Sequence, residues 1–389
     1  MSHQSSTLVN IIVEHIKSTP HQRISFASYM DLALYHPGCG YYTTKSSVFG
    51  HNGDFITSPY LGRDFGELLA IQFVDMWQVL GQPAPFHLVE MGAGQGVIAS
   101  DVLTYLQHYH PDCYAALDYI IIEKSSALRS IQRERRAHEK ITWTTLDDLL
   151  PVTGCLFSNE LVDAFPVHIV EKHNNQLQEI YITAQDNMLQ EALGPLSTDR
   201  LTQYFDLIDI DLLTNAYSDG YRTEVNLTAL DWLSTVVNHI NQGFLLTVDY
   251  GHTAQRYYSP ARHKGTLKCY YQHRHHDDPY TNIGRQDLTA HVDFTALQNH
   301  GENVGFTNLG YTRQGLFLMA LGLGDRLANL TQRLSPDPNS FNQLIQRRQS
   351  LHQLMDMNPM GLGTFGVLVQ SKGVDKTVSL KGLTVPPLY

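Results

Sequence analysis

Three closely spaced glycines mark the part of the chain best suited to bind a small ligand. An apolar run over residues 86–89 ends at Glu90, and Gly92, Gly94 and Gly96 follow before a helical pattern begins. This order predicts a strand, a tight turn and a helix start. Because glycine has no Cβ, the backbone there can adopt positive φ, and a ligand can approach the main chain closely.

The spacing of these glycines separates two classes of nucleotide ligand. A dinucleotide fold requires G-x-G-x-x-G or G-x-G-x-x-A, and its last small residue would fall at Val97. The chain instead has Gly96 one position earlier and an acid, Glu90, before the loop. This E-x-G-x-G-x-G arrangement is typical of loops that bind S-adenosylmethionine, and a glycine-rich turn without a ligand is the alternative.

A second acid, Glu123, follows the next predicted strand at 119–122. A carboxylate at the tip of such a strand can accept hydrogen bonds from both hydroxyls of a ribose. An ordinary acid at a strand end is the alternative. The position of Glu123 after the glycine loop favours its role as the ligand of a ribose.

An amide and two more acids follow the strand predicted at 155–158. The carboxyl ends of parallel strands line the ligand crevice, so Asn159 and Glu160 should lie beside a methyl donor, with Asp163 about one helical turn further on. Two carboxylates suit a cationic acceptor such as a guanidinium, which stays protonated at neutral pH. A helix-capping role explains Glu160 almost equally well.

His291 and Asp293 form a further candidate pair. Two positions apart, they would share one face of an extended segment, where they can position a substrate or accept a proton. An N-cap at Asp293 with His291 hydrogen-bonded nearby fits the spacing equally well. The adjacent His275 and His276 lack the spaced partners of a metal site, so no metal is expected.

The elements that must position these residues alternate between strands and helices. Strands are predicted near 86–90, 119–122, 155–158, 166–170 and 244–250. This alternation predicts an α/β fold with a doubly wound, mostly parallel sheet of the Rossmann-like type. We expect a helical N-terminal region at 1–80, a core at 81–178 and 226–389, and a largely helical, substrate-shaping insertion at 179–225.

Composition limits the partners. The 389 residues include 27 basic and 38 acidic side chains, and the net charge of −11 disfavours nucleic acid and favours a cationic partner. The four cysteines are scattered, and neither a leader peptide nor a transmembrane segment is indicated. We therefore expect a cytoplasmic protein, as a monomer or homodimer.

Separate phrases of the sequence, in one order, resemble the MidA family, the bacterial and mitochondrial relatives of an arginine-methylating assembly factor of respiratory complex I. They lie at 29–37, 40–42, 53–59, 65–68, 90–96, 159–160, 163–166, 248–251 and 287–294. The chain departs from the family at Ala93-Gly94-Gln95-Gly96, where Pro-Gly-Arg-Gly is frequent, and at Tyr60, where an acid is frequent.

The resemblance implies a class I methyltransferase that uses S-adenosylmethionine, with S-adenosylhomocysteine as product, to dimethylate a protein arginine symmetrically. The substrate would be a subunit of a respiratory NADH dehydrogenase-type complex. In this scheme Glu160 and Asp163 orient the guanidinium, and His291 or Asp293 takes the released proton. The expected cofactor residues are Gly53, Asp54, Thr57, Ser58, Pro59, Glu90, Gly92, Ala93, Gly94, Gly96, Glu123 and Asn159. A methyltransferase for another acceptor and a cofactor-binding assembly chaperone with little turnover are the alternatives.

Overall fold

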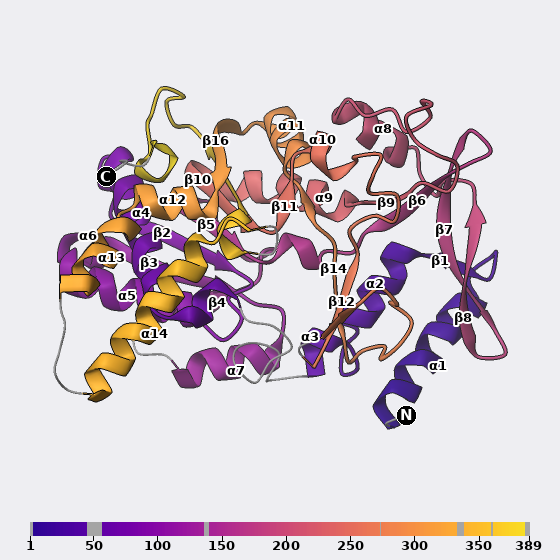
Figure 1. The fold of residues 1–389 in the computed structure, drawn as a ribbon, viewed down its shortest axis with the longest axis horizontal. Helices are drawn as coiled ribbons and strands as arrows, with labels where there is room; N and C mark the ends of the chain where they lie inside the picture. Colours follow the sequence, from indigo (N-terminus) through magenta and orange to yellow (C-terminus); the bar gives the residue numbers. More distant parts are fainter. Residues whose placement is uncertain are drawn as a thin grey trace.

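The computed structural model describes residues 3–44, 57–135, 140–272, 274–332, 338–358 and 361–385. A seven-stranded sheet and its helices form one end of the molecule, and a smaller antiparallel sheet with α1 (His3–Ser18) forms the other (Figure 1). Within these ranges, no helix is long and apolar enough to cross a membrane. Gly53 and Asp54 of the expected cofactor loop lie outside the described residues.

The seven-stranded sheet has the order β16-β17-β10-β5-β2-β3-β4. Five neighbouring strands are parallel, namely β10 (Ile240–Asp249), β5 (Val152–Asn159), β2 (Phe86–Met91), β3 (Leu117–Ile122) and β4 (Ile141–Thr144). β17 (Gly366–Lys372) runs antiparallel to its neighbours β10 and β16 (Thr307–Arg313). The strand order reverses between β2 and β5: β3 and β4 follow β2 on one side of the sheet, and β5 and β10 lie on the other side. Ligands bind outside the carboxyl ends of the strands at such a reversal. The predicted Rossmann-like fold is therefore confirmed.

Helices cover both faces of this sheet. α4 (Asp64–Val79) and α5 (Val97–Tyr109) pack on one face, and α9 (Leu227–Val236) and α11 (Phe294–Val304) pack on the other. Consecutive residues of β2 therefore join different clusters, with Leu88 in the first and Val89 in the second. Burial of both faces explains the continuous apolar runs by which these strands were predicted.

The prediction of a largely helical insertion at 179–225 was wrong. Its main elements are the strands β7 (Gln176–Gln185), β8 (Met188–Gly194) and β9 (Arg222–Val225), with one helix, α8 (Arg200–Leu207). Residues 179–182 of β7 are all buried, so the strand has no polar-apolar alternation. The missed signal was the turn at Asp186 and Asn187, whose φ values of 50° and 60° suit a tight hairpin.

β6 (His168–His173) also lies elsewhere than predicted. It was expected in the parallel sheet near 166–170, but it pairs antiparallel with β7 and β9 in the smaller sheet. β1 (Arg23–Ser25) of the N-terminal region pairs with β7 as well. The helices α1 and α2 (Phe26–Tyr35) pack against this sheet, so the N-terminal region and the insertion share one core.

Between β10 and α11 the chain forms short strands near the carboxyl edge of the main sheet. β11 (Gly251–His252) pairs with β15 (Val292–Asp293), and β12 (Lys268–Tyr271) lies between β13 (Arg274–His276) and β14 (Asp287–Thr289). The Ala290 N–H donates to the Asp163 carbonyl at 2.9 Å. This bond fixes the segment beside the residues that follow β5.

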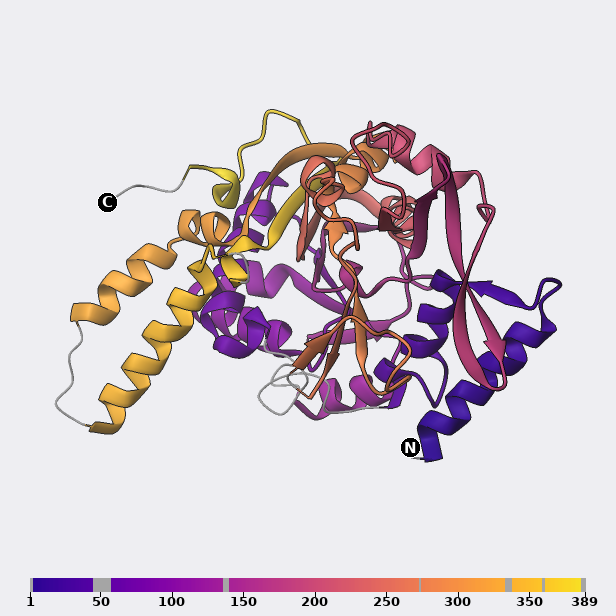
Figure 2. The same cartoon turned by 45° about the vertical axis from the view of Figure 1, so that its right-hand side comes forward.

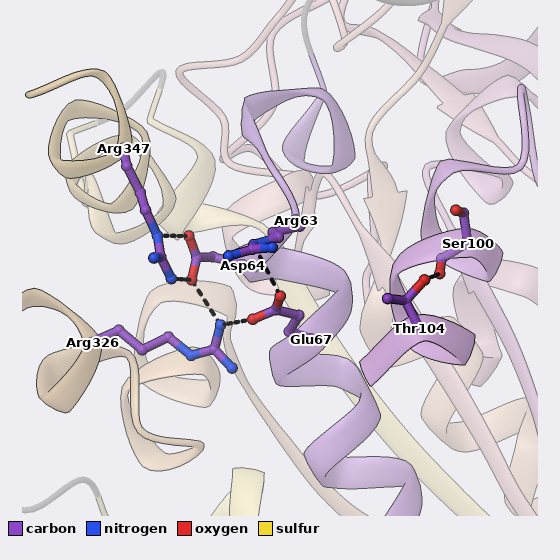
Figure 3. A network of polar contacts seen from close by, with 7 residues as sticks. All are labelled: Arg63, Asp64, Glu67, Ser100, Thr104, Arg326 and Arg347. Atoms are coloured by element: carbon purple, nitrogen blue, oxygen red, sulfur yellow. Dashed lines mark hydrogen bonds and ion pairs between the residues drawn. The ribbon is translucent and has the colours of Figure 1, made fainter. Parts of the chain in front are cut away.

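The C-terminal helices α13 (Leu323–Gln332) and α14 (Pro338–Met355) lie side by side at the edge of the molecule (Figure 2). Arg326 and Arg347 of these helices each donate hydrogen bonds of 2.7 Å to Asp64 at the start of α4 (Figure 3). Arg326 also contacts Glu67. This ion-pair network anchors the helix pair to the core.

Candidate active site

The glycine loop has the backbone geometry that only glycine adopts readily. Gly92, Gly94 and Gly96 have φ values of 71°, 52° and 76°, and Gly96 is the N-cap of α5. A Cβ on Gly92 would lie 2.8 Å from Cδ1 of Leu161. Glycine at this position therefore lets Leu161 pack against the loop, while Gly92 and Gly94 still line the cavity between β2 and the segment after β5.

Glu123 lies beside this loop at the end of β3. It is 8% exposed, and burial raises its pKa. Its carboxylate accepts hydrogen bonds from the Ser125 N–H at 2.8 Å and from the Gln132 amide at 3.2 Å. Gln132, from α7 (Ser126–Arg135), also donates to the Gly94 carbonyl at 2.8 Å and so ties the carboxylate to the glycine loop. The remaining lone pairs of the carboxylate can accept from ribose hydroxyls.

A cavity of about 520 Å³ joins these elements. Gly92, Gly94 and Glu123 line one side, Glu160 lies beside them, and Tyr42 comes from the N-terminal region. The volume is within the range of small-molecule sites.

A smaller cavity of about 50 Å³ adjoins the glycine loop. Its lining includes Thr57, Pro59, Glu90, Ala93 and Asn159. The Asn159 amide donates to the Glu160 carboxylate at 3.1 Å, and its own Oδ1 is buried with no partner among the described residues. An unpartnered acceptor beside a carboxylate suits an ammonium group, such as that of the methionine part of S-adenosylmethionine.

Three carboxyl groups lie close together at the carboxyl ends of β5 and β10, namely those of Glu160, Asp163 and Asp249. Glu160 has a φ of 51°, which is strained for a residue with a Cβ, and its N–H donates to the Val248 carbonyl at 2.9 Å. Asp249 accepts from the N–H groups of residues 161–163 at 3.2, 2.9 and 3.4 Å. Leu161, and not Glu160, occupies the N-cap of the short helix that follows, so the capping alternative for Glu160 does not apply.

These three carboxyl groups have no cationic partner within the described ranges. Burial, followed by the charge of Asp249, raises the pKa of Glu160 to about 8, and the same two causes raise the pKa of Asp163 well above its ordinary value. Burial raises the pKa of Asp249 to about 7. A cation that entered here would favour the ionised forms, since opposite charges stabilise each other in a site of low dielectric.

Three comparisons connect this geometry to known proteins. The family described as "Putative S-adenosyl-L-methionine-dependent methyltransferase" matches residues 68–312. The chain belongs to this family. The structure of a protein from Burkholderia thailandensis bound to S-adenosyl-homocysteine is 31% identical, with a TM-score of 0.84 over 97% of this chain and 95% of that one. The predicted resemblance and the predicted cofactor, S-adenosylmethionine, are thereby confirmed.

Curated relatives of this methyltransferase carry a more specific name. Protein arginine methyltransferase NDUFAF7, mitochondrial, from Xenopus tropicalis is 30% identical over 95% of this chain and 88% of its own length. The Drosophila melanogaster homolog is 30% identical over 81% of this chain and 75% of its own length.

The remaining candidates of this methyltransferase, His291 and Asp293, have different surroundings. Asp293 is the N-cap of α11, where it accepts from the N–H groups of Thr295 and Ala296, and Tyr204 donates to its second oxygen at 3.2 Å. The capping alternative therefore describes Asp293. Burial and the neighbouring His252 lower the pKa of His291 to about 3, so its imidazole is neutral at ordinary pH.

Sequence reasoning missed two acids and two tyrosines at this site. Tyr42 donates to the fully buried Asp287 at 2.8 Å, and the rings of Tyr35 and Tyr42 stack with their centroids 5.5 Å apart. Asp249 is the last residue of β10, just as Glu123 directly follows β3. The expectation that ligand-binding residues lie at the carboxyl ends of parallel strands could therefore have identified Asp249. Asp287 and the tyrosines come from distant segments, and their only signal was that they lie in the phrases shared with the family, at 29–37, 40–42 and 287–294.

Proposed function

We propose that this methyltransferase acts on an arginine side chain of a protein. The observation that carries this proposal is the group of three carboxyl groups, Glu160, Asp163 and Asp249, beside the glycine loop and without a cationic partner in the described ranges. Asp249 is fully buried, and the other two are partly exposed, so a substrate can reach them. A guanidinium is permanently charged and presents a planar fork of donors to carboxylates. The names of the curated relatives support the same acceptor.

S-adenosylmethionine supplies the chemistry of the reaction, a methyl group on a sulfonium that a nucleophilic nitrogen can attack. In our proposal Glu160 and Asp163 hold the guanidinium, concentrate its electron density on one nitrogen and place that nitrogen in line for attack. The strained backbone of Glu160 and the bonds from Asp249 to residues 161–163 fix both carboxylates before the substrate binds.

The proton released by the guanidinium requires an acceptor. An imidazole whose pKa is lowered to about 3 is a weak base, whereas a guanidinium beside Glu160 would favour its carboxylate form, which lies next to the departing proton. We therefore assign proton acceptance to Glu160 rather than to His291. The oxygens of Asp293 are already used by the start of α11 and by Tyr204.

The finer parts of the proposal rest on the family resemblance. They are symmetric dimethylation and a subunit of a respiratory NADH dehydrogenase-type complex as substrate. Methylation of another acceptor, and a chaperone that binds the cofactor and holds a partner subunit with little turnover, are the competing functions.

Calorimetric titration with S-adenosylmethionine, S-adenosylhomocysteine and NADH tests the cofactor site first. We expect binding of the two adenosyl ligands only, and its loss in Gly94→Val. Transfer of labelled methyl groups to arginine peptides and to purified NADH dehydrogenase-type subunits then tests the acceptor. Cofactor binding with no label on arginine would contradict the arginine assignment, and partner binding that survives Glu160→Gln with an intact assembly phenotype would favour the chaperone.

A further inference from the structure

Three arginines near the proposed acceptor site have no acidic partner. Arg256 of α10 (Ala254–Tyr257), Arg262 and Arg313 form no ion pair within the described ranges. By contrast, Arg326 and Arg347 each pair with carboxylates. Other arginines, such as the exposed Arg348, also lack an ion pair in the described part of the chain, but these three lie together, since the charges of all three act on the imidazole of His252.

Hydrogen bonds to carbonyl groups gather these arginines around one segment. Arg262 donates through Nη1 to the carbonyls of Arg256 at 2.6 Å and Tyr257 at 3.1 Å. Arg313 donates through Nη1 to the carbonyls of Gly251 at 3.1 Å and Thr364 at 2.7 Å. A guanidinium has five N–H donors, so these bonds fix each group and leave further donors for an anion. Arg256 itself is exposed. We call Arg256, Arg262 and Arg313 the basic subsite.

Aromatic rings connect the basic subsite to the acidic site. Tyr250 directly follows Asp249, and its ring centroid lies 4.2 Å from that of His291, which lies 5.1 Å from that of His252. His252 is 7% exposed, and the Nδ1 atoms of both histidines are buried with no partner among the described residues. Burial, followed by the charges of Arg262 and Arg256, lowers the pKa of His252 to about 3. The histidines therefore add no positive charge. Lys268, whose charge also reaches His291, is paired with Asp277, so the unpaired positive charge comes from the three arginines.

We propose that the basic subsite binds an acidic side chain of the substrate protein, an aspartate or glutamate near the arginine that is methylated. This inference rests on the proposed arginine methyltransferase function. A substrate segment that places its arginine among Glu160, Asp163 and Asp249 would extend past Tyr250 to the basic subsite, and an acid at that distance would meet guanidinium donors. The acidic acceptor site would select an arginine, and the basic subsite would select an acid on one side of that arginine. Together they would also fix the direction in which the substrate chain binds.

The test measures binding separately from methyl transfer. The wild-type protein, saturated with S-adenosylhomocysteine so that no transfer can occur, is titrated with peptides that carry one central arginine. A single glutamate is moved through the flanking positions, and matched peptides carry glutamine or lysine there. We expect glutamate at one or two positions to bind roughly 5- to 20-fold more tightly than glutamine, which is the effect of one charge-assisted hydrogen bond.

Charge reversal sharpens this test. Arg256→Glu should abolish the preference for glutamate over glutamine at the same positions, because one charge of the subsite is reversed, and it should remove no hydrogen bond from the Arg256 side chain within the described residues. Arg348→Glu, an exposed arginine of α14 in the C-terminal helix pair, is the matched control and should keep the wild-type preference. Raised ionic strength should reduce the preference, since exposed charges are screened.

Three results would overturn the inference. They are equal or absent binding of the glutamate and glutamine peptides, a glutamate preference that persists in Arg256→Glu, and Arg256-dependent binding of inorganic phosphate that displaces the peptide, which would indicate a phosphate ligand instead. A failure of the proposed function would show differently, as cofactor binding without transfer to any arginine peptide.

Discussion

Two groups of acidic residues in this molecule, both wholly or partly buried, differ in their partners. Asp64 is 4% exposed, and hydrogen bonds from Arg347 and Arg326 outweigh burial and lower its pKa (Figure 3). Glu160 and Asp163 have no such cation in the described ranges, and burial raises the pKa of both. Burial and acid content alone therefore do not mark a functional site. An incomplete charge balance distinguishes the acids at the proposed acceptor site from the acids that hold the C-terminal helices.

The difference has an energetic consequence. Removing the acid from a buried ion pair destabilises the fold, because the partner's charge is left uncompensated, whereas an acid without a partner opposes folding until a cationic ligand pairs with it. An acid group that lowers the stability of the protein without its ligand is expected at a site selected for binding. The two groups should therefore respond in opposite ways to the same substitution.

The largest expected effect is on turnover. Removal of one negative charge in Glu160→Gln or Asp163→Asn should lower kcat/KM for an arginine substrate by roughly 10²- to 10⁴-fold, because each carboxylate both orients the guanidinium and favours loss of its proton. Calorimetry should show S-adenosylmethionine binding within a few-fold of the wild type. The exposed Asp118→Asn is the control. Unchanged turnover in both variants would remove the acidic site from the mechanism.

The next effect is on folding. Asp64→Asn should lower the free energy of unfolding by about 2–4 kcal/mol, because breaking the buried pair leaves Arg347 without an acidic partner in the network and Arg326 with Glu67 alone. Urea denaturation measures this loss. Turnover of the folded variant should stay within a few-fold of the wild type. A neutral or stabilising Asp64→Asn would show that the ion-pair network does not anchor the helix pair.

The cofactor side and the acceptor side of the site also differ in how far they could be predicted from the sequence. The cofactor side depends on local order. Glycines with positive φ follow β2 directly, and Glu123 follows β3 directly, so a strand pattern and one motif locate both. The main sheet was predictable for a related reason, since strands buried on both faces are apolar over their whole length.

The acceptor side depends on tertiary contacts that the sequence does not display. Asp249 reaches the backbone of Val162, which lies 87 positions earlier, and Tyr42 reaches Asp287, which lies 245 positions later. No spacing rule connects such residues. The small sheet was missed because the buried run of β7 contains Glu179 and has polar residues on both sides, so the strand shows neither a continuous apolar run nor a regular alternation. The pairing of the Asp64 network was missed because an acid at a helix start has many uses.

The pH dependence of stability should also differ between the two groups. The pKa of Glu160 is about 8 in the folded protein and 4.5 without perturbation, so the folded state binds more protons between these values and the free energy of unfolding falls as pH rises. We expect Glu160→Gln to remove roughly 1–2 kcal/mol of this fall between about pH 6 and pH 8. For Asp64 the pKa is lowered, so its contribution persists above its unperturbed pKa of 3.8 and is lost only as pH falls through its folded value. Denaturant unfolding at several pH values checks both signs, and an identical slope in Glu160→Gln would contradict the first.

The smallest expected effect tests whether burial, rather than pairing, gives the ion-pair network its strength. Arg63 lies 3.2 Å from Glu67 in the same network, but its side chain is 68% exposed. Arg63→Gln should therefore change the free energy of unfolding by less than about 0.5 kcal/mol, because solvent screens an exposed pair and Glu67 keeps its contact with Arg326. Urea denaturation of Arg63→Gln beside Asp64→Asn makes the comparison within one network. A loss in Arg63→Gln as large as that in Asp64→Asn would mean that the number of ion pairs sets the stability of this region. The lack of cationic partners would then no longer distinguish the acids at the acceptor site from the acids of the ion-pair network.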